Sequence, residues 1–335
     1  MLAARHPWSI LLPALAFVLC TACTDAGDES TQAGDGLDET GDGDGDGDGD
    51  GDGDGDGDGD GDGDGDGDGD GDGDGDGDGD GDGDGDGDGD GDGDGDGDGL
   101  PNIPPTDNPS STRHTPIPLG TSDAALGYWE YLPPGYGGGQ QYPLLVFLHG
   151  VGENGNGDSE LHKVIVNGLP KLIAQDKWPD DRPFVVLSPQ HIGGGCPSPD
   201  EVQAFLAYAI EAYDTNIERI YLTGLSCGAI GAWNYLGKYL DSQIAALVPI
   251  AGNGNGAWNQ SGCELGTVPI WAFHGDADPT VDVGGTINPI SNLQGCDPAP
   301  IADMIIYEGV GHNSWTMTYN LAAGHDVFAW MLEHP

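Results

Sequence analysis

Apolar and polar residues follow two different periods along the chain from about residue 116 to the C-terminus. Short continuous apolar runs, typical of strands buried on both faces, alternate with stretches in which apolar residues recur every three or four positions. We expect strands at 128–132, 144–148, 184–187, 220–223, 246–250, 270–273 and 304–307, and helices at 161–174, 198–213, 229–240 and 327–332. This alternation predicts an α/β fold with a mostly parallel, doubly wound sheet covered by helices on both faces.

The start of the helix expected at 198–213 carries several signals. Ser198 is a capping residue, Pro199 suits the first turn, and Glu201 follows three residues after the cap. The helix expected at 161–174 has apolar residues at helical spacing, but Pro170 conflicts with a continuous helix there.

The N-terminal third has a different composition. Residues 41–99 are an unbroken Gly-Asp alternation with 29 aspartates, and a segment this polar cannot bury a core. We therefore expect residues 23–115 to be a disordered acidic linker, extended over the Pro-rich stretch at 101–118, and residues 116–335 to be a single folded domain.

The charge of the chain limits its partners. Eight Lys and Arg stand against 59 Asp and Glu, so no basic patch can neutralise phosphates and a nucleic-acid partner is not expected. The Gly-Asp repeat resembles the opening of an EF-hand calcium loop, yet no glutamate stands at the twelfth position. A solvated acidic linker is the expectation, with weak and diffuse cation binding left open.

The first residues are typical of an export signal. Residues 8–19 are apolar but too few to span a membrane comfortably, and we expect residues 1–22 to be a signal peptide. Thr21-Ala22-Cys23 resembles the end of a bacterial lipobox, which makes Cys23 a candidate for lipidation. Cys20 stands where that pattern prefers Leu, so simple secretion after cleavage behind Ala22 is the alternative to a cell-surface or outer-membrane lipoprotein.

Export implies an oxidising compartment in which cysteines can pair. Four cysteines remain in the expected domain, and they are Cys196, Cys227, Cys263 and Cys296. Four cysteines permit three pairings, among which the sequence does not choose. We favour Cys263 with Cys296 and Cys196 with Cys227 over metal ligation, because these four cysteines include no Cys-x-x-Cys spacing.

The pentapeptide Gly224-Leu225-Ser226-Cys227-Gly228 is the strongest chemical signal. It lies between the strand expected at 220–223 and the helix expected at 229–240, where a Gly-x-Ser-x-Gly is typical of the nucleophile elbow. The turn holds the serine backbone in a strained conformation with no room for flanking side chains, which the glycines satisfy. We predict that Ser226 is a catalytic nucleophile.

A serine hydroxyl needs a base to take its proton and an acid to orient that base. Asp278 follows the strand expected at 270–273 and is the predicted acid, with Asp276 and then Asp282 as alternatives. His312 follows the last expected strand and is the predicted base. The chain order of serine, acid and histidine is the order found in α/β-hydrolases.

An oxyanion hole needs two backbone N–H groups. We assign one to Cys227, directly after the nucleophile, and the other to Val151, in the loop after the strand at 144–148. His149 in the same loop is interpreted as structural.

Taken together, these motifs resemble one family. They are Phe147-Leu148-His149-Gly150, the Gly-x-Ser-x-Gly at 224–228, His-Gly-x-x-Asp at 274–278 and Gly-His-x-Ser-Trp at 311–315. The chain from about 117 to 335 resembles secreted esterases of the α/β-hydrolase superfamily, similar to feruloyl and acetylxylan esterases and polyhydroxybutyrate depolymerases. The same branch is often labelled a predicted peptidase of prolyl-oligopeptidase type.

The resemblance implies carboxyl-ester hydrolysis by Ser226, Asp278 and His312, with no metal or organic cofactor. Family members often have Met directly after the serine, where this chain has Cys227. They also often have two glycines after that Met, and this chain keeps Gly228 but has Ala229 at the second position. Cys227 is then either disulfide-bonded, as in some feruloyl esterase relatives, or simply buried.

The leading hypothesis is an exported serine esterase, anchored to a membrane through lipid alone, which cleaves esters on polysaccharide or a polyester. One alternative is a serine peptidase, although the chain has no room for the propeller of prolyl oligopeptidases. The other is a non-catalytic surface lipoprotein with a hydrolase fold. The acyl and alcohol specificity and the oligomeric state stay open.

Overall fold

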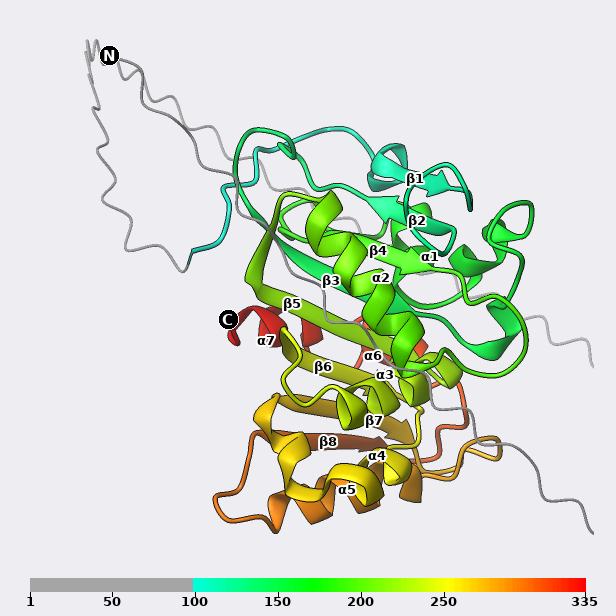
Figure 1. Cartoon of the computed structure of the whole chain (residues 1–335), viewed down its shortest axis with the longest axis vertical. Helices are drawn as coiled ribbons and strands as arrows, with labels where there is room; N and C mark the ends of the chain where they lie inside the picture. The colour runs from blue at the N-terminus through cyan, green and yellow to red at the C-terminus, as the bar shows by residue number, and fades with distance from the viewer. Residues whose placement is uncertain (1–98) are drawn as a thin grey trace, which may run out of the picture. The chain divides into compact units, whose positions relative to one another are not determined.

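The computed structural model describes residues 99–335, so the expectations for the signal peptide, Cys23 and nearly all of the Gly-Asp repeat fall outside the described residues. One eight-stranded sheet runs through this part (Figure 1). Its strands are β1 His114–Ile117, β2 Tyr128–Tyr131, β3 Tyr142–Leu148, β4 Val185–Pro189, β5 Thr215–Leu225, β6 Ile244–Ile250, β7 Ile270–Gly275 and β8 Ala302–Tyr307.

The strands lie in the order β1-β2-β4-β3-β5-β6-β7-β8. Strands β3 to β8 pair in parallel, whereas β1 and β2 form an antiparallel edge beside β4. The predicted mostly parallel sheet is therefore confirmed. Its carboxyl edge gathers the loops that follow β3, β5, β7 and β8, which is the edge where ligands bind in open α/β sheets.

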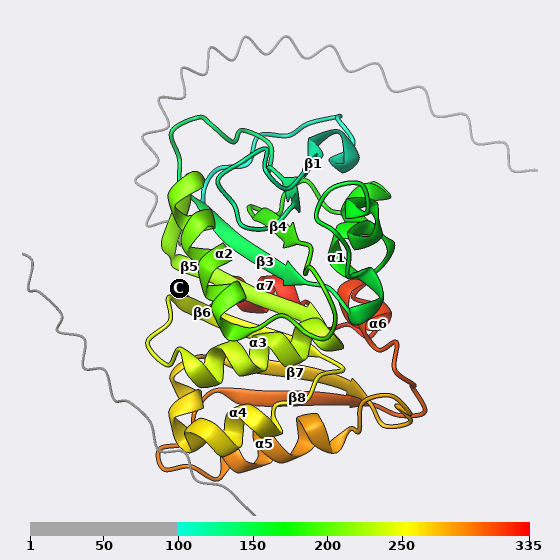
Figure 2. The ribbon, with the colours of Figure 1, turned by 45° about the vertical axis from the view of Figure 1, so that its right-hand side comes forward.

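Helices cover both faces of the sheet (Figure 2). On one face lie α2 Pro199–Ala212, α3 Cys227–Lys238, α4 Asn255–Ser261 and α5 Gly284–Gln294, and on the other α1 Gly168–Ala174, α6 Trp315–Tyr319 and α7 Val327–Leu332. Short 3-10 helices are η1 Ser110–Arg113, η2 Val151–Glu153, η3 Leu161–Val166 and η4 Gly262–Thr267. Among residues 99–335 no helix has the length and apolar character needed to cross a membrane.

The central strand β3 explains the continuous apolar run in the sequence. All seven of its residues are buried, and their side chains alternate between two apolar clusters. Leu144 and Val146 pack with the helices α2 and α3, whereas Leu145 and Phe147 pack with α1, α6 and α7. A strand that is covered on both faces has no polar side, as the sequence indicated.

The helix expected at 161–174 is two helices, and that prediction was wrong. The chain breaks at Asn167, which is extended at φ −137° and ψ 165°, and Gly168 follows at φ +62°. A side chain at Gly168 would meet Phe147 at 2.6 Å, so glycine is required at this turn. Pro170 then lies in the first turn of α1, where its missing N–H is tolerated.

The ordered fold begins before residue 116 and includes residues that were expected to belong to the extended linker. Helix η1 and strand β1 occupy residues 110–117, and β1 pairs with β2. The buried hydroxyl of Ser110 donates a hydrogen bond to the carbonyl of Ile173 over 2.9 Å. The pattern missed this edge because its residues are mostly polar and show no apolar alternation.

Candidate active site

Ser226 lies at a sharp turn between β5 and α3. Its backbone has φ 52° and ψ −117°, a conformation that costs a non-glycine residue conformational energy and that clusters at functional sites. A Cβ at Gly228 would lie 2.1 Å from the carbonyl oxygen of Leu148, and one at Gly224 would lie 2.8 Å from the backbone of Gly228. Both flanking positions therefore require glycine, for the steric reason that the motif implied.

A chain of hydrogen bonds joins Ser226 to two residues that are distant in sequence. The Nε2 atom of His312 lies 2.9 Å from Ser226 Oγ, and its Nδ1 lies 2.7 Å from Asp278 Oδ2. An ionised carboxylate can only accept, so Nδ1 carries the proton and Nε2 is free to accept from the serine hydroxyl. The three residues come from the loops after β5, β7 and β8.

The side chain of Asp278 is fully buried and nevertheless favours its ionised form. Its Oδ1 atom accepts from the backbone N–H groups of Thr280 at 2.8 Å and Val281 at 3.0 Å. Burial by itself would raise the pKa of Asp278, but these bonds and the bond from His312 hold the pKa below its ordinary value. The carboxylate can thus keep the imidazole of His312 in one orientation.

A second buried histidine supports this carboxylate, and the sequence reasoning did not assign it a role. His274 Nε2 lies 3.0 Å from Asp278 Oδ2 and 3.0 Å from the carbonyl oxygen of Val281. The carbonyl can only accept, so Nε2 carries the proton, and Nδ1 accepts from the hydroxyl of Thr286 at 2.8 Å. The only signal in the sequence was its place in the His-Gly-x-x-Asp motif.

The two alternative acids, Asp276 and Asp282, accept hydrogen bonds from backbone N–H groups instead. Asp276 Oδ1 accepts from the N–H of Gly309 at 2.7 Å, and Asp282 Oδ1 accepts from the N–H of Gly284 at 2.8 Å. Neither carboxylate is bonded to His312 in the described part of the chain. The structure therefore brings Asp278, and not these two, to the histidine.

The two N–H groups assigned to an oxyanion hole both stand at the start of a helix. Val151 is the first residue of η2 and Cys227 the first of α3, and neither N–H donates to an acceptor within residues 99–335. Gly150 lies against the serine, since a Cβ placed on it would be 3.7 Å from Ser226 Cβ. The loop after β3 thus reaches the nucleophile, as expected.

His149 fixes the entry to that loop. Its Nδ1 donates to the carbonyl oxygen of Gly150 at 2.7 Å, and its Nε2 accepts from the backbone N–H of His191 at 2.9 Å. Burial lowers the pKa of His149 to about 4, so the ring is neutral near pH 7. These contacts give His149 a structural place, in agreement with its interpretation from the sequence.

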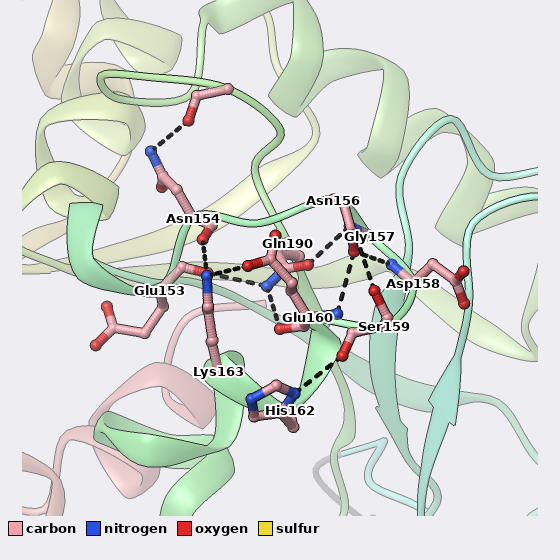
Figure 3. A network of polar contacts seen from close by, with 11 residues as sticks. Glu153, Asn154, Asn156, Gly157, Asp158, Ser159, Glu160, His162, Lys163 and Gln190 are labelled. Carbon is pink, nitrogen blue, oxygen red and sulfur yellow. Dashed lines mark hydrogen bonds and ion pairs between the residues drawn. The ribbon is translucent and has the colours of Figure 1, made fainter.

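Glu153 is a buried carboxyl group at the end of η2 that was not singled out in the sequence. It accepts from Asn167 Nδ2 at 2.6 Å, and a Cβ on Gly150 would lie 3.0 Å from its Oε2. Burial raises the pKa of Glu153. In Figure 3 its carboxyl group points away from the polar cluster that surrounds Gln190.

Gln190 ties down the backbone of the segment that follows η2 (Figure 3). Its Nε2 atom donates to the carbonyls of Glu153 at 3.0 Å and Glu160 at 2.8 Å, and its Oε1 accepts from the N–H of Gly157 at 2.8 Å. Lys163 pairs with Glu160 in the same cluster. A segment without regular apolar spacing is therefore held by polar bonds.

Two disulfides are present, and they are the two pairs favoured from the sequence. Cys196 is bonded to Cys227, which ties the loop before α2 to the residue after the nucleophile, and Cys263 is bonded to Cys296. The sulfur of Cys227 is thus occupied, while its N–H donates to no acceptor in the part of the chain that the structure describes. No group of three or more His, Cys, Asp or Glu within residues 99–335 is arranged to hold a metal ion.

No family model and no curated protein matches the chain. A search of solved structures finds a thermostable esterase at 24% identity with a TM-score of 0.50, covering 66% of this chain and 62% of that one. The feruloyl esterase module from Clostridium thermocellum, solved with sinapinate, matches at 16% identity and TM-score 0.49 over 70% of this chain and 94% of the module. Dipeptidyl peptidase 4 from Porphyromonas gingivalis matches at 14% identity and TM-score 0.48, covering 66% of this chain and 35% of the peptidase.

The likeness to the thermostable esterase shows the fold, which is that of the α/β-hydrolases. The chain spans about three fifths of the length of that esterase.

Proposed function

We propose that the protein is a serine hydrolase that cleaves carboxyl esters through an acyl-enzyme. The observation that carries the proposal is the hydrogen-bonded chain from Ser226 through His312 to Asp278. A carboxylate, an imidazole in a defined tautomer and a serine at a strained turn are the parts that nucleophilic acyl transfer requires. No role for a cofactor enters this chemistry.

In the proposed reaction, the oxygen of Ser226 attacks the ester carbonyl while Nε2 of His312 takes the hydroxyl proton. His312 then gives that proton to the departing alcohol, and the acyl group stays on the serine. Water deprotonated by His312 releases the acid and restores the serine. Asp278 orients the imidazole throughout and stabilises its positive charge.

The negative oxygen of the tetrahedral intermediate would be bound by the N–H groups of Val151 and Cys227. Both are unpaired within residues 99–335, and Cys227 begins the twelve-residue helix α3, whose dipole favours negative charge at this end. Because Gly150 touches Ser226, the loop that carries Val151 is close enough for this role. The substrates that we propose are acyl or feruloyl esters on polysaccharide, or a polyester.

Replacement of the nucleophile tests the proposal directly. Purified Ser226→Ala protein should lose nearly all hydrolysis of p-nitrophenyl acetate, on the order of a thousandfold or more. Ser291→Ala, on the exposed side of α5, is the matched control and should keep full activity. Full activity in the Ser226→Ala protein would falsify the proposal, and equal activity on peptide amides and esters would favour a peptidase.

We also propose that the protein is exported and anchored through a lipid on Cys23. The support is the signal-like sequence of residues 1–22 and the lipobox resemblance at 21–23. Growth of an expressing bacterium on labelled palmitate should label the mature protein and leave a Cys23→Ala variant unlabelled. Absence of label on the native protein would mean simple secretion.

A further inference from the structure

A groove between α1 and α6 lies next to the proposed catalytic residues. Its first part is a cavity of 240 Å³ with Gly168 and Lys171 on one side and Trp315 and Asn320 on the other. A second cavity of 240 Å³ extends it toward Arg182. The two cavities share Leu172, Lys177, Tyr319 and Asn320, so we treat them as one α1–α6 groove.

The groove begins beside the catalytic histidine. The ring of Trp315, which lines its first part, packs edge to face on the ring of His312 with 5.1 Å between centroids. On the other wall, a Cβ at Gly168 would lie 3.0 Å from the side chain of Leu225, the residue before the nucleophile. Figure 2 shows α1 and α6 side by side next to the strand ends that carry the site.

The charge of the groove is opposite to that of the chain. The chain has only eight Lys and Arg against 59 Asp and Glu, yet Lys171, Lys177 and Arg182 all line this groove, although Arg182 is paired with Asp326. Within residues 99–335 the ammonium groups of Lys163 and Lys238 are ion-paired with carboxylates, whereas those of Lys171 and Lys177 contact none. Two unpaired cations in an acidic protein suggest that their partner is a ligand.

Uncharged hydrogen-bonding groups accompany these cations. The side chains of Gln175, Thr316 and Asn320 line the first cavity together with the aromatic rings of Trp315 and Tyr319. Amides and hydroxyls suit the hydroxyl groups of sugars, whereas Trp315 and Tyr319 are only 9% and 2% exposed and offer a ligand little ring surface. A small compact anion would instead need donors that converge on one point.

We propose that the α1–α6 groove binds a carboxylate-bearing polysaccharide, such as a chain of uronate units, and presents its ester to Ser226. The inference rests on the proposed esterase function and names its substrate class. Two cavities in series suit an extended chain, with Lys171 and Lys177 facing successive carboxylates. The surrounding negative charge would repel the same polymer from the rest of the surface, which makes the groove selective.

Binding is measured first, without catalysis. Ser226→Ala protein should bind unesterified oligogalacturonate in isothermal titration calorimetry, and the added double change Lys171→Gln with Lys177→Gln should weaken binding about tenfold. Lys238→Gln removes one lysine charge on another face and is the matched control, with an unchanged Kd. Raising salt to 0.5 M should weaken the native interaction and affect the double variant little.

Catalysis is compared next on two polymers, acetylated polygalacturonate and acetylated neutral xylan. The ratio of kcat/KM for the charged polymer to that for the neutral one should fall about tenfold in the Lys171→Gln, Lys177→Gln protein, through KM. An unchanged ratio, or equal oligogalacturonate binding by the double variant and its parent, would overturn the groove proposal. If the esterase function itself were wrong, the native protein would fail on p-nitrophenyl acetate as well.

Discussion

Two groups of residues approach Ser226 from opposite directions, and they are built differently. The acid–base arm consists of His274, Asp278 and His312, whose side chains are bonded to one another. The oxyanion arm consists of the loop from His149 to Glu153, whose proposed contribution is a backbone N–H. Each arm contains a buried histidine that does not touch the serine, since His274 holds Asp278 and His149 holds Gly150.

The two arms differ because one must maintain a protonation state and the other must maintain the position of a backbone group. The acid–base arm must preserve a charge and a tautomer, so its parts are titratable side chains with satisfied hydrogen bonds. The oxyanion arm must preserve the position of a backbone group, so its parts are a glycine in close contact and polar side chains that hold the loop. We therefore expect substitutions that change charge but keep shape to lower activity when they fall in the acid–base arm. Substitutions that add bulk should lower activity when they fall in the oxyanion arm.

The largest effect should come from a change of charge without a change of shape. In Asp278→Asn the amide cannot stabilise a positive imidazole and can favour the wrong tautomer of His312, so kcat/KM should fall roughly a thousandfold or more. Asp276→Asn is the matched control on the same loop and should remain within a few-fold of the native rate. Similar losses in both variants on p-nitrophenyl acetate would mean that the loop, and not the carboxylate, matters.

A single methyl group should damage the oxyanion arm next most strongly. In Gly150→Ala the new Cβ would lie 2.9 Å from Leu225 Cδ1 and 3.0 Å from Glu153 Oε2, so either these buried side chains or the loop must shift. We expect kcat to fall about a hundredfold, as for loss of one oxyanion donor. In Gly152→Ala nothing lies within 4 Å of the new Cβ, so kcat should change little. An equal fall in kcat in the two variants would contradict the assignment of this loop to the oxyanion hole.

The supporting histidine of the acid–base arm should have a smaller effect. His274→Phe removes the donor to Asp278 while keeping an aromatic ring, and kcat for p-nitrophenyl acetate should fall about tenfold with little change in KM. His274→Gln restores a donor and should recover part of the loss. If both variants lose activity only in proportion to the folded protein seen by circular dichroism, His274 would be merely structural.

The smallest effect concerns the stability contributed by the oxyanion arm. Burial lowers the pKa of His149 to about 4, so between pH 6.5 and 4 the unfolded chain binds a proton that the folded chain does not. The free energy of unfolding contributed by His149 is fully present above pH 6.5 and decreases as pH falls, by up to about 3 kcal/mol.

Urea unfolding at pH 7 and pH 4.5 measures this decrease. His149→Asn should be less stable than the native protein at pH 7 and should lose less stability on acidification. An equal loss in the two proteins would show that His149 is not a buried neutral imidazole.

The sequence predicted those features that depend on short-range patterns. The buried runs at 144–148 and 246–250 became β3 and β6, and the glycines at 224 and 228 were explained by contacts that the turn requires. The helix at 327–332 appears with the same bounds. In each case a short stretch of sequence carries the signal, although the carbonyl that excludes a side chain at Gly228 belongs to the distant Leu148.

Some features that depend on distant contacts and carry no motif were not predicted. Helices α4, α5 and α6 are rich in Gly, Asn, Ser and Thr, so their residues show no clear apolar period. Glu153 stood in a polar loop, and its burial beside Gly150 follows from a bond to Asn167 fourteen residues later. No sequence pattern singled out Lys171 and Lys177, whose place in one cavity with Trp315 and Asn320 depends on α1 and α6 lying together.

Covalent labelling of Ser226 tests the central claim most directly. A fluorophosphonate probe should modify the folded protein, and mass spectrometry should place the adduct on Ser226 in the peptide that holds residues 224–228. His312→Ala should greatly slow the labelling, because Nε2 no longer takes the proton of the serine hydroxyl. We predict one adduct at Ser226 that does not form when the protein is denatured before the probe is added, and a folded native protein with no adduct there would contradict the assignment of Ser226 as an activated nucleophile.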